Sequence, residues 1–185
     1  MRRDAMVTVW TIGHSTRSFE ELVEVLRGYG IEAVVDVRTV PRSRKNPQFN
    51  RDELETKLPE AGIAYVHAKE LGGLRHPAKD SPNMGWHNDS FRGFADYMQT
   101  ESFRDALEWL MSQARTAKTA IMCAETLPWR CHRSLIADAL LVRGFEVVEI
   151  FDAAKSQPHK LTSFAVVDGH VITYPAQQQD LPYLA

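Results

Sequence analysis

Strand-like and helix-like segments alternate along this chain, and that alternation most restricts the folds that it can adopt. Short apolar runs predict strands at residues 7–12, 31–37, 63–66, 119–123 and 145–150. Between them, apolar residues at helical spacing predict helices at residues 18–28, 50–59, 91–114 (with a break near Thr100) and 129–142. Alternating β and α units favour a three-layer α/β/α fold, with a mostly parallel sheet of about five strands covered by helices on both faces.

Local signals refine this outline. Ser18-Phe-Glu-Glu21 and Asn50-Arg-Asp-Glu53 have the spacing of helix capping boxes, and Asp168-Gly169 predicts the turn of a C-terminal β-hairpin at residues 164–173. Residues 68–90 are rich in Gly, Pro, Asn and Asp, so we expect a long loop with a functional or mobile role. We expect one domain over residues 1–185, with a core at 7–174 and a flexible tail at 175–185.

Composition excludes several classes of protein. The net charge of −2 gives no global attraction to nucleic acid or anionic membranes, and no apolar run approaches the ~20 residues of a membrane span. Two cysteines do not make a disulfide framework. The N-terminus lacks the apolar stretch of a secretory signal, so we expect a cytoplasmic protein of bacterial type. Neither a cofactor nor an oligomeric state is indicated.

Polar side chains follow nearly every predicted strand. Ligands of parallel α/β sheets bind beyond the carboxyl ends of the strands, where the strand order reverses. The polar residues at these ends are His14 and Ser15, Asp36 and Arg38, His67, Cys123 and Glu125, and Asp152. We therefore expect them to share one edge of the sheet and to form a site there.

The densest group of reactive side chains lies at residues 120–134. Cys131 is flanked by Arg130, His132 and Arg133 where a helix should begin, so we expect its thiol to have a lowered pKa and to act as a nucleophile or polarised donor. Cys123, inside an apolar strand, is equally consistent with a core position. Because His132 directly follows Cys131 and neighbouring helical side chains diverge by about 100°, we expect no metal site.

These patterns assign candidate roles. The catalytic candidates are His14, Asp36, Glu125, Cys131 and His132. The candidates for substrate binding are Ser15, Arg38, Arg42, Ser43, Gly72, Gly73, Trp129 and Arg133. Guanidinium groups suit carboxylate and phosphate, so Arg38 and Arg133 are expected to clamp an anion, although either could instead form a structural ion pair with Asp36 or Glu125.

Several motifs resemble the family known as domain of unknown function 488. They are Thr11-Ile-Gly-His-Ser15, Asp36-Val-Arg38 with Pro41-Arg-Ser43, Leu71-Gly-Gly73, and Cys123-Ala-Glu125 with Cys131-His-Arg133. They span roughly residues 7–152. The resemblance implies a soluble α/β domain in which these positions are marked, and it implies no substrate.

A looser similarity links the chain to rhodaneses and cysteine-based phosphatases, which have an Asp-Val-Arg-like strand end and then a strand, a cysteine, an anion-binding loop, an arginine and a helix. The loop after Cys123 is longer than the phosphatase loop and contains Pro128 but no glycine, so the similarity is one of topology.

The sequence leaves three functions open. The first is an enzyme for a small anionic substrate, phosphorylated or nucleotide-like. The second is rhodanese-like sulfur transfer or phosphatase chemistry at a cysteine. The third is a non-catalytic nucleic-acid module that uses the basic residues Arg38, Arg42, Arg44, Lys45 and Arg51.

Overall fold

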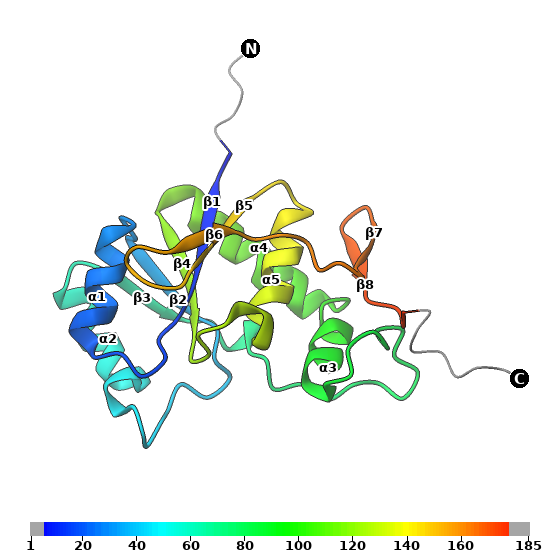
Figure 1. Ribbon diagram of the computed structural model, residues 1–185, viewed down its shortest axis with the longest axis horizontal. Coiled ribbons are helices and arrows are strands. Elements are labelled where there is room, and N and C mark those ends of the chain that lie inside the picture. The colour runs from blue at the N-terminus through cyan, green and yellow to red at the C-terminus, as the bar shows by residue number, and fades with distance from the viewer. Residues whose placement is uncertain (1–5, 178–185) are drawn as a thin grey trace, which may run out of the picture.

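A mostly parallel sheet forms the centre of the protein, whose computed structural model describes residues 6–177. The sheet has six strands in the order β3-β2-β4-β1-β5-β6, and β6 runs antiparallel to β5. Its strands are β1 (Thr8–Gly13), β2 (Ala33–Asp36), β3 (Ala64–His67), β4 (Thr119–Cys123), β5 (Glu146–Ile150) and β6 (Ser156–Pro158). Since β1 to β5 pair in parallel, their carboxyl ends lie together, at the lower edge in Figure 1.

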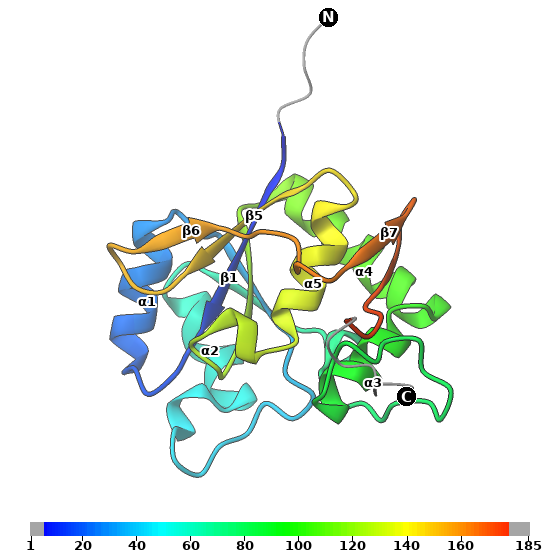
Figure 2. The same cartoon turned by 45° about the vertical axis from the view of Figure 1, so that its right-hand side comes forward.

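Helices cover both faces of the sheet, as the alternating pattern predicted. The helices are α1 (Phe19–Gly28), α2 (Arg51–Glu60), α3 (Asp89–Tyr97), α4 (Glu101–Thr116) and α5 (Arg133–Leu141). One buried cluster joins α1 and α2 to the sheet through Leu22, Leu26 and Leu54. A second cluster, with Leu107 and Leu135, joins α4 and α5 to the opposite face, so the layers are α/β/α (Figures 1 and 2).

Capping residues fix several helix ends. Ser18 forms the expected capping box with Glu21 at the start of α1, and Thr100 caps α4, which confirms the break there. The capping box predicted at Asn50 is wrong, because no side chain caps α2. The Asn50 side chain instead accepts a hydrogen bond from the Ser43 backbone N–H (2.7 Å) and ties down the loop before the helix.

The C-terminal part adds two antiparallel pairs. The hairpin of β7 (Val166–Asp168) and β8 (Val171–Thr173) is confirmed; Gly169 in its turn has φ 60°, and the hairpin stands apart from the main sheet. The sixth strand, β6, was not expected. Its sequence, Ser-Gln-Pro, is short and exposed and lacks the apolar signal of a strand.

The long loop after β3 is held by polar contacts. It contains a 3-10 turn (Lys69–Leu71) and otherwise no helix or strand before α3. The carboxylate of Asp96 accepts hydrogen bonds from the side chains of Ser81 (2.6 Å) and Asn83 (2.7 Å), both buried. The second half of the loop is thus anchored to α3. Over residues 6–177, no helix has the length and apolar character needed to cross a membrane.

Candidate functional site

The site lies where the carboxyl ends of three neighbouring strands meet. β4 lies between β2 and β1, and its last residue, Cys123, pairs with Gly13 at the end of β1. On the other side, Asp36 at the end of β2 pairs with Met122. From β1 and β2 the chain continues into α1 and α2 on one face, whereas from β4 it continues into α5 on the other. This divergence is the topological switch point at which α/β proteins bind ligands.

The two cysteines contact each other at this point. Cys123 Sγ and Cys131 Sγ are 2.7 Å apart, and both residues are buried free thiols. Cys123 is therefore part of the site rather than only a core residue.

Cys131 lies before the helix that was expected to contain it. Residues Pro128–Arg130 form a 3-10 turn, Cys131 is extended (φ −137°, ψ 145°), and α5 begins at Arg133 with His132 as its N-cap. The predicted start near Trp129 is wrong because Pro128 begins a separate turn. No side chain caps α5; the N–H groups of Ser134 and Leu135 donate instead to the carbonyl oxygens of Cys131 (3.1 Å) and His132 (3.0 Å).

His132 is held so that one ring nitrogen faces the Cys131 thiol. Its Nε2 lies 2.9 Å from the carbonyl oxygen of Val37, which can only accept, so Nε2 carries a proton. In the neutral ring, Nδ1 is then an acceptor, and it lies 3.6 Å from Cys131 Sγ. This arrangement allows His132 to take the thiol proton.

The close approach of His132 requires glycine at position 73. A Cβ atom at Gly73 would lie 2.4 Å from His132 Nδ1. Gly72 packs against Thr39 in the same way, with a Cβ 2.4 Å from Thr39 Oγ1. The Gly-Gly pair thus brings the long loop against the histidine.

The pKa values of the two thiols are shifted in opposite directions. The hydrogen bond with Cys123, and then the hydrogen bond and charge of His132, lower the pKa of Cys131 to about 3. Burial raises the pKa of Cys123 well above its ordinary value. The lowered pKa agrees in direction with the sequence expectation, but its largest cause, the second cysteine, was not foreseen.

Arg133 lies beneath the cysteines rather than on the surface, with 1% of its area exposed. It donates from Nε to Cys123 Sγ (3.0 Å), from Nη1 to Thr11 Oγ1 (3.2 Å) and from Nη2 to the Glu125 carbonyl oxygen. Burial opposes its charge, but the interactions of its guanidinium with the sulfur atoms of Cys123 and Cys131 raise the pKa of Arg133. Because its guanidinium faces protein atoms, it supports the thiols.

Arg38 is also engaged by the protein. Its Nε and Nη2 donate to the two carboxylate oxygens of Asp36 (2.9 and 2.6 Å), and Nη2 also donates to the Phe49 carbonyl oxygen (2.7 Å). Nη1 donates to His14 Nε2 (3.2 Å). Of five N–H donors, four face described residues, so one on Nη1 remains for a ligand. The structural ion pair with Asp36, the alternative considered above, is therefore present.

His14 serves the same network. Its Nδ1 donates to the Ser15 carbonyl oxygen (2.8 Å), because Nε2 must accept from Arg38. Burial, with a further contribution from the positive charge of Arg38, lowers the pKa of His14 to about 4. Both ring nitrogens are occupied, so His14 positions Arg38 and has no free lone pair for a substrate proton.

A cavity of about 340 Å³ opens onto the thiols. Besides both cysteines and His132, its lining includes Arg38, Gly73, Glu125 and Arg130. An adjoining cavity of about 500 Å³ shares Arg38 and Glu125 and is lined by His14, Ser15, Arg42 and Ser43. The sheet edge thus offers a thiol site connected to a basic, hydroxyl-bearing one.

A sequence model of the family described as "Domain of unknown function DUF488" matches residues 18–140. The chain belongs to this family. The matched range includes Asp36, Arg38, both cysteines and His132, whereas His14 and Ser15 precede it. No curated protein and no solved structure matches the chain.

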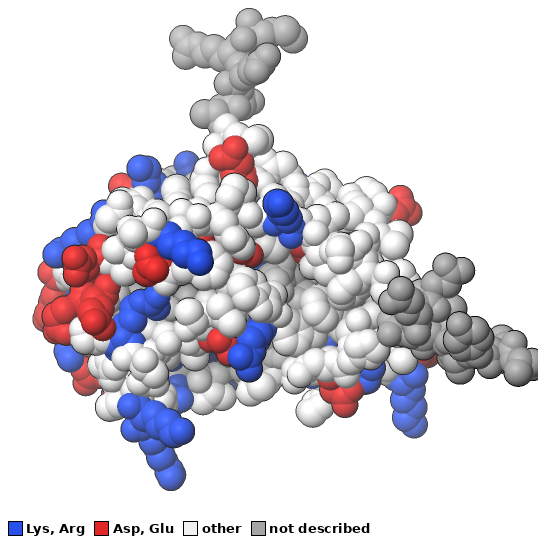
Figure 3. Space-filling view, in the orientation of Figure 1, with Lys and Arg blue, Asp and Glu red and all other residues white. Residues whose placement is uncertain are grey.

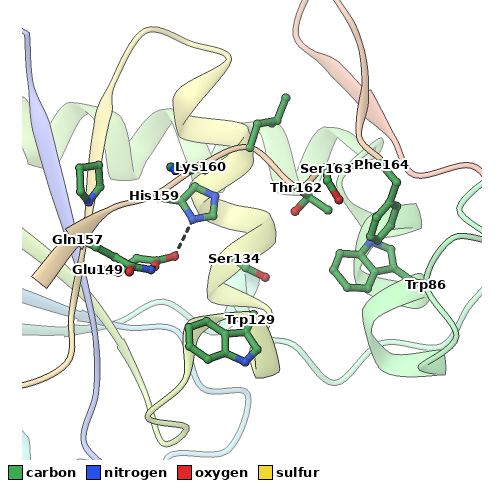
Figure 4. Close-up of a pocket in the computed structure, with 12 residues that line it drawn as sticks. Trp86, Trp129, Ser134, Glu149, Gln157, His159, Lys160, Thr162, Ser163 and Phe164 are labelled. Atoms are coloured by element: carbon green, nitrogen blue, oxygen red, sulfur yellow. Dashed lines mark hydrogen bonds and ion pairs between the residues drawn. The ribbon is translucent and has the colours of Figure 1, made fainter.

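In this DUF488 protein, most of the predicted site residues lie around these two cavities, but Trp129 lies elsewhere. Its exposed ring lines a separate cavity of about 650 Å³ with Trp86, Ser134, His159 and Phe164 (Figure 4). Asp36 and Gly72 lie under the site without lining the thiol cavity.

A buried charged cluster beside that larger cavity escaped sequence reasoning. His159 Nε2 and Nδ1 contact Asp138 (2.8 Å) and Glu149 (2.7 Å), and the Tyr174 hydroxyl donates to Asp138 (2.8 Å); Figure 4 shows the contact with Glu149. The sequence signal for this cluster was Asp138, an acidic residue inside the apolar helix α5, because a buried charge requires a partner. Among residues 6–177, no group of three or more His, Cys, Asp or Glu side chains is suited to hold a metal ion.

Proposed function

We propose that this DUF488 protein is a cysteine-dependent enzyme that binds a small anionic substrate in the thiol cavity and attacks it with Cys131. The observation that carries the proposal is the position of Cys131 Sγ, 2.7 Å from Cys123 Sγ and 3.6 Å from His132 Nδ1. A thiolate stabilised by a histidine and by a second thiol is the reactive form of cysteine.

The chemical step uses the Cys131–His132 pair. The Cys131 thiolate attacks the electrophilic atom of the substrate, a sulfur–substrate bond forms, and the bond to the leaving group breaks with both electrons on that group. The proton that Cys131 gave to His132 Nδ1 then passes to the leaving group. The Val37 carbonyl keeps the His132 ring oriented while it holds the proton and then gives it up.

We assign anion binding to side chains whose N–H or O–H donors face the cavities. Arg130 is exposed at the rim of the thiol cavity, and Arg38 has one remaining N–H. Arg42, Ser15 and Ser43 line the adjoining cavity and would receive a second charged group, such as the phosphate of a phosphorylated or nucleotide-like substrate. Glu125, at the boundary of both cavities, would exchange protons with the bound molecule. Asp36, His14 and Arg133 act as positioning residues.

The surface favours a small anion over nucleic acid. On the face drawn in Figure 3, acidic side chains gather at the left over α1, and the loop between β2 and α2, with Arg42, Arg44 and Lys45, projects as a small basic area at the lower left. Arg51, one of the basic candidates, is paired with Glu55. A phosphate backbone would require a broader positive stripe.

The test measures alkylation of each cysteine separately. Cleavage after Glu125 places Cys123 and Cys131 on different peptides, so mass spectrometry resolves their rates in the unaltered protein. We expect Cys131 to react with iodoacetamide at a rate that is flat above about pH 5, and Cys123 to react only in alkali. Cys131 with the pH profile of an ordinary thiol would overturn the proposal.

A second arm tests charge selection. Iodoacetate should alkylate Cys131 faster, relative to iodoacetamide, in the wild type than in Arg130→Gln. Arg104→Gln, in α4 and outside the lining of either cavity, is the matched control. Equal ratios in all three proteins would exclude an anion-binding role for Arg130.

A further inference from the structure

The contact between the two sulfur atoms carries an inference about the kind of substrate. The Sγ–Sγ distance of 2.7 Å exceeds the length of a disulfide by about 0.7 Å. Cys123 is the last residue of β4, and Cys131 has an extended backbone just before α5. Closure of this gap of about 0.7 Å would bring the two sulfurs to bonding distance.

We propose that Cys131 and Cys123 form a dithiol pair that reduces small anionic disulfides and becomes an intramolecular disulfide. The inference rests on the proposed function, because it uses Cys131 as the attacking group. It adds a chemical role for Cys123, which in a single-cysteine mechanism only stabilises the Cys131 thiolate.

The asymmetry of the pair gives each sulfur its role. Cys131 has the His132 imidazole to accept its proton. Cys123 is the more buried of the two, and burial raises the pKa of its thiol, so it stays protonated until it reacts. Thiol–disulfide exchange needs one thiolate to attack and a second thiol to resolve the mixed disulfide. Arg133 Nε, 3.0 Å from Cys123 Sγ, stabilises negative charge on that sulfur as it attacks.

The reaction balances in two steps. The Cys131 thiolate attacks one sulfur of R–S–S–R, the S–S bond breaks, and the departing RS⁻ takes the proton held on His132 to become RSH. Cys123 then attacks Cys131 Sγ in the mixed disulfide, and the second RS⁻ leaves with the proton from Cys123. The substrate gains two electrons and the cysteine pair loses two. An external thiol returns the pair to the reduced form.

The cavity selects the substrate. Its volume of about 340 Å³ admits a small molecule rather than a folded protein, and Arg38 and Arg130 line it. Arg42 lines the adjoining cavity. These residues favour disulfides whose R groups carry carboxylates.

The experiment compares two small disulfides, one anionic and one neutral. Reduced protein is mixed without oxygen with dithiodiglycolate, which carries two carboxylates, or with neutral bis(2-hydroxyethyl) disulfide. Intact mass and released thiol are followed with time. The expected result is loss of two hydrogens from the protein, two thiols released, and a rate about tenfold higher for the anionic probe, relative to a free thiol reacting with the same probes.

Variants separate the two proposals. Cys123→Ser should stop at a stable mixed disulfide with one thiol released, and Cys131→Ser should not react. A stable mixed disulfide on the wild-type Cys131 would overturn the dithiol role of Cys123 and leave Cys131 as the nucleophile. Absence of any reaction at Cys131 would overturn both. Equal relative rates for the two probes would overturn the anionic substrate class.

Discussion

His132 Nδ1 lies 3.6 Å from Cys131 Sγ while the opposite ring nitrogen, Nε2, donates to the Val37 carbonyl oxygen. A backbone carbonyl cannot donate, so this second contact fixes the tautomer and leaves Nδ1 as the atom that meets the thiol. Two adjacent residues, which would diverge within a helix, face each other here at the junction where Cys131 is extended and His132 is the N-cap of α5.

Replacement of His132 should therefore weaken the thiolate. His132→Gln removes both the hydrogen bond and the charge that lower the pKa of Cys131. We expect the alkylation rate of Cys131 at about pH 6 to fall about tenfold, and less at alkaline pH, where the thiol ionises unaided. A peptide-resolved pH profile checks this. An unchanged profile would show that Cys123 and Arg133 suffice.

Gly73→Ala should have a similar effect without touching a titratable group. The added Cβ would lie 2.4 Å from His132 Nδ1, so the ring must move from the thiol. We expect loss of Cys131 reactivity at about pH 6 with an intact fold by circular dichroism. Gly28→Ala is the control, since nothing lies within 4 Å of its Cβ position. Equal reactivity in the two variants would contradict the proposed contact.

The Asp36–Arg38 pair should contribute to stability far more than an exposed pair. Asp36→Asn leaves the buried guanidinium without its charge partner, and we expect a loss of about 3 kcal/mol in the free energy of unfolding. Glu55→Gln, in the exposed pair with Arg51, should change it far less, because solvent screens that pair. Urea unfolding of both variants measures the difference; similar losses would refute this ranking.

His14 should make the protein sensitive to acid. Its pKa falls from 6.5 to about 4 on folding, so the neutral ring is the stabilising form. The contribution is complete above pH 6.5 and is lost as pH falls toward 4, by up to about 3 kcal/mol. His14→Gln should be less stable than the wild type at neutral pH and should lose this part of the acid dependence. If the free energies of unfolding of the two proteins fell in parallel as the pH was lowered, this role of His14 would be contradicted.

Much of the fold was predictable because apolar periodicity records which face of an element is buried. The alternation located β1 to β5, and the parallel registers place Gly13, Asp36 and Cys123 at one edge. β6 was not predictable, since its pairing with β5 depends on backbone hydrogen bonds and not on side-chain burial.

The site was predictable in its members and less so in its contacts. Strand ends identified His14, Arg38 and Cys123, but the sequence does not specify where a long side chain points. Arg133 turns inward because the thiols and the Thr11 hydroxyl offer buried acceptors. The start of α5 was misplaced because Pro128 suits the first turn of either kind of helix.

The cluster around His159 should make the protein sensitive to alkali, opposite to the effect of His14. Burial alone would lower its pKa, but hydrogen bonds and charges of Asp138 and Glu149 raise the pKa of His159 to about 9. The protonated ring is therefore the stabilising form. Its contribution is complete below pH 6.5 and is lost as pH rises toward 9, by up to about 3 kcal/mol.

His159→Gln tests this, because it keeps a side-chain donor but removes the charge between two buried carboxylates. The free energy of unfolding should drop most below pH 6.5, and the difference from the wild type should shrink by pH 9. Tyr174→Phe is the control: it removes a hydrogen bond to Asp138 but no positive charge, so its cost should vary little with pH over this range. If the His159→Gln difference stayed constant with pH, the ring would be neutral in the folded protein and the two carboxylates would share a proton instead.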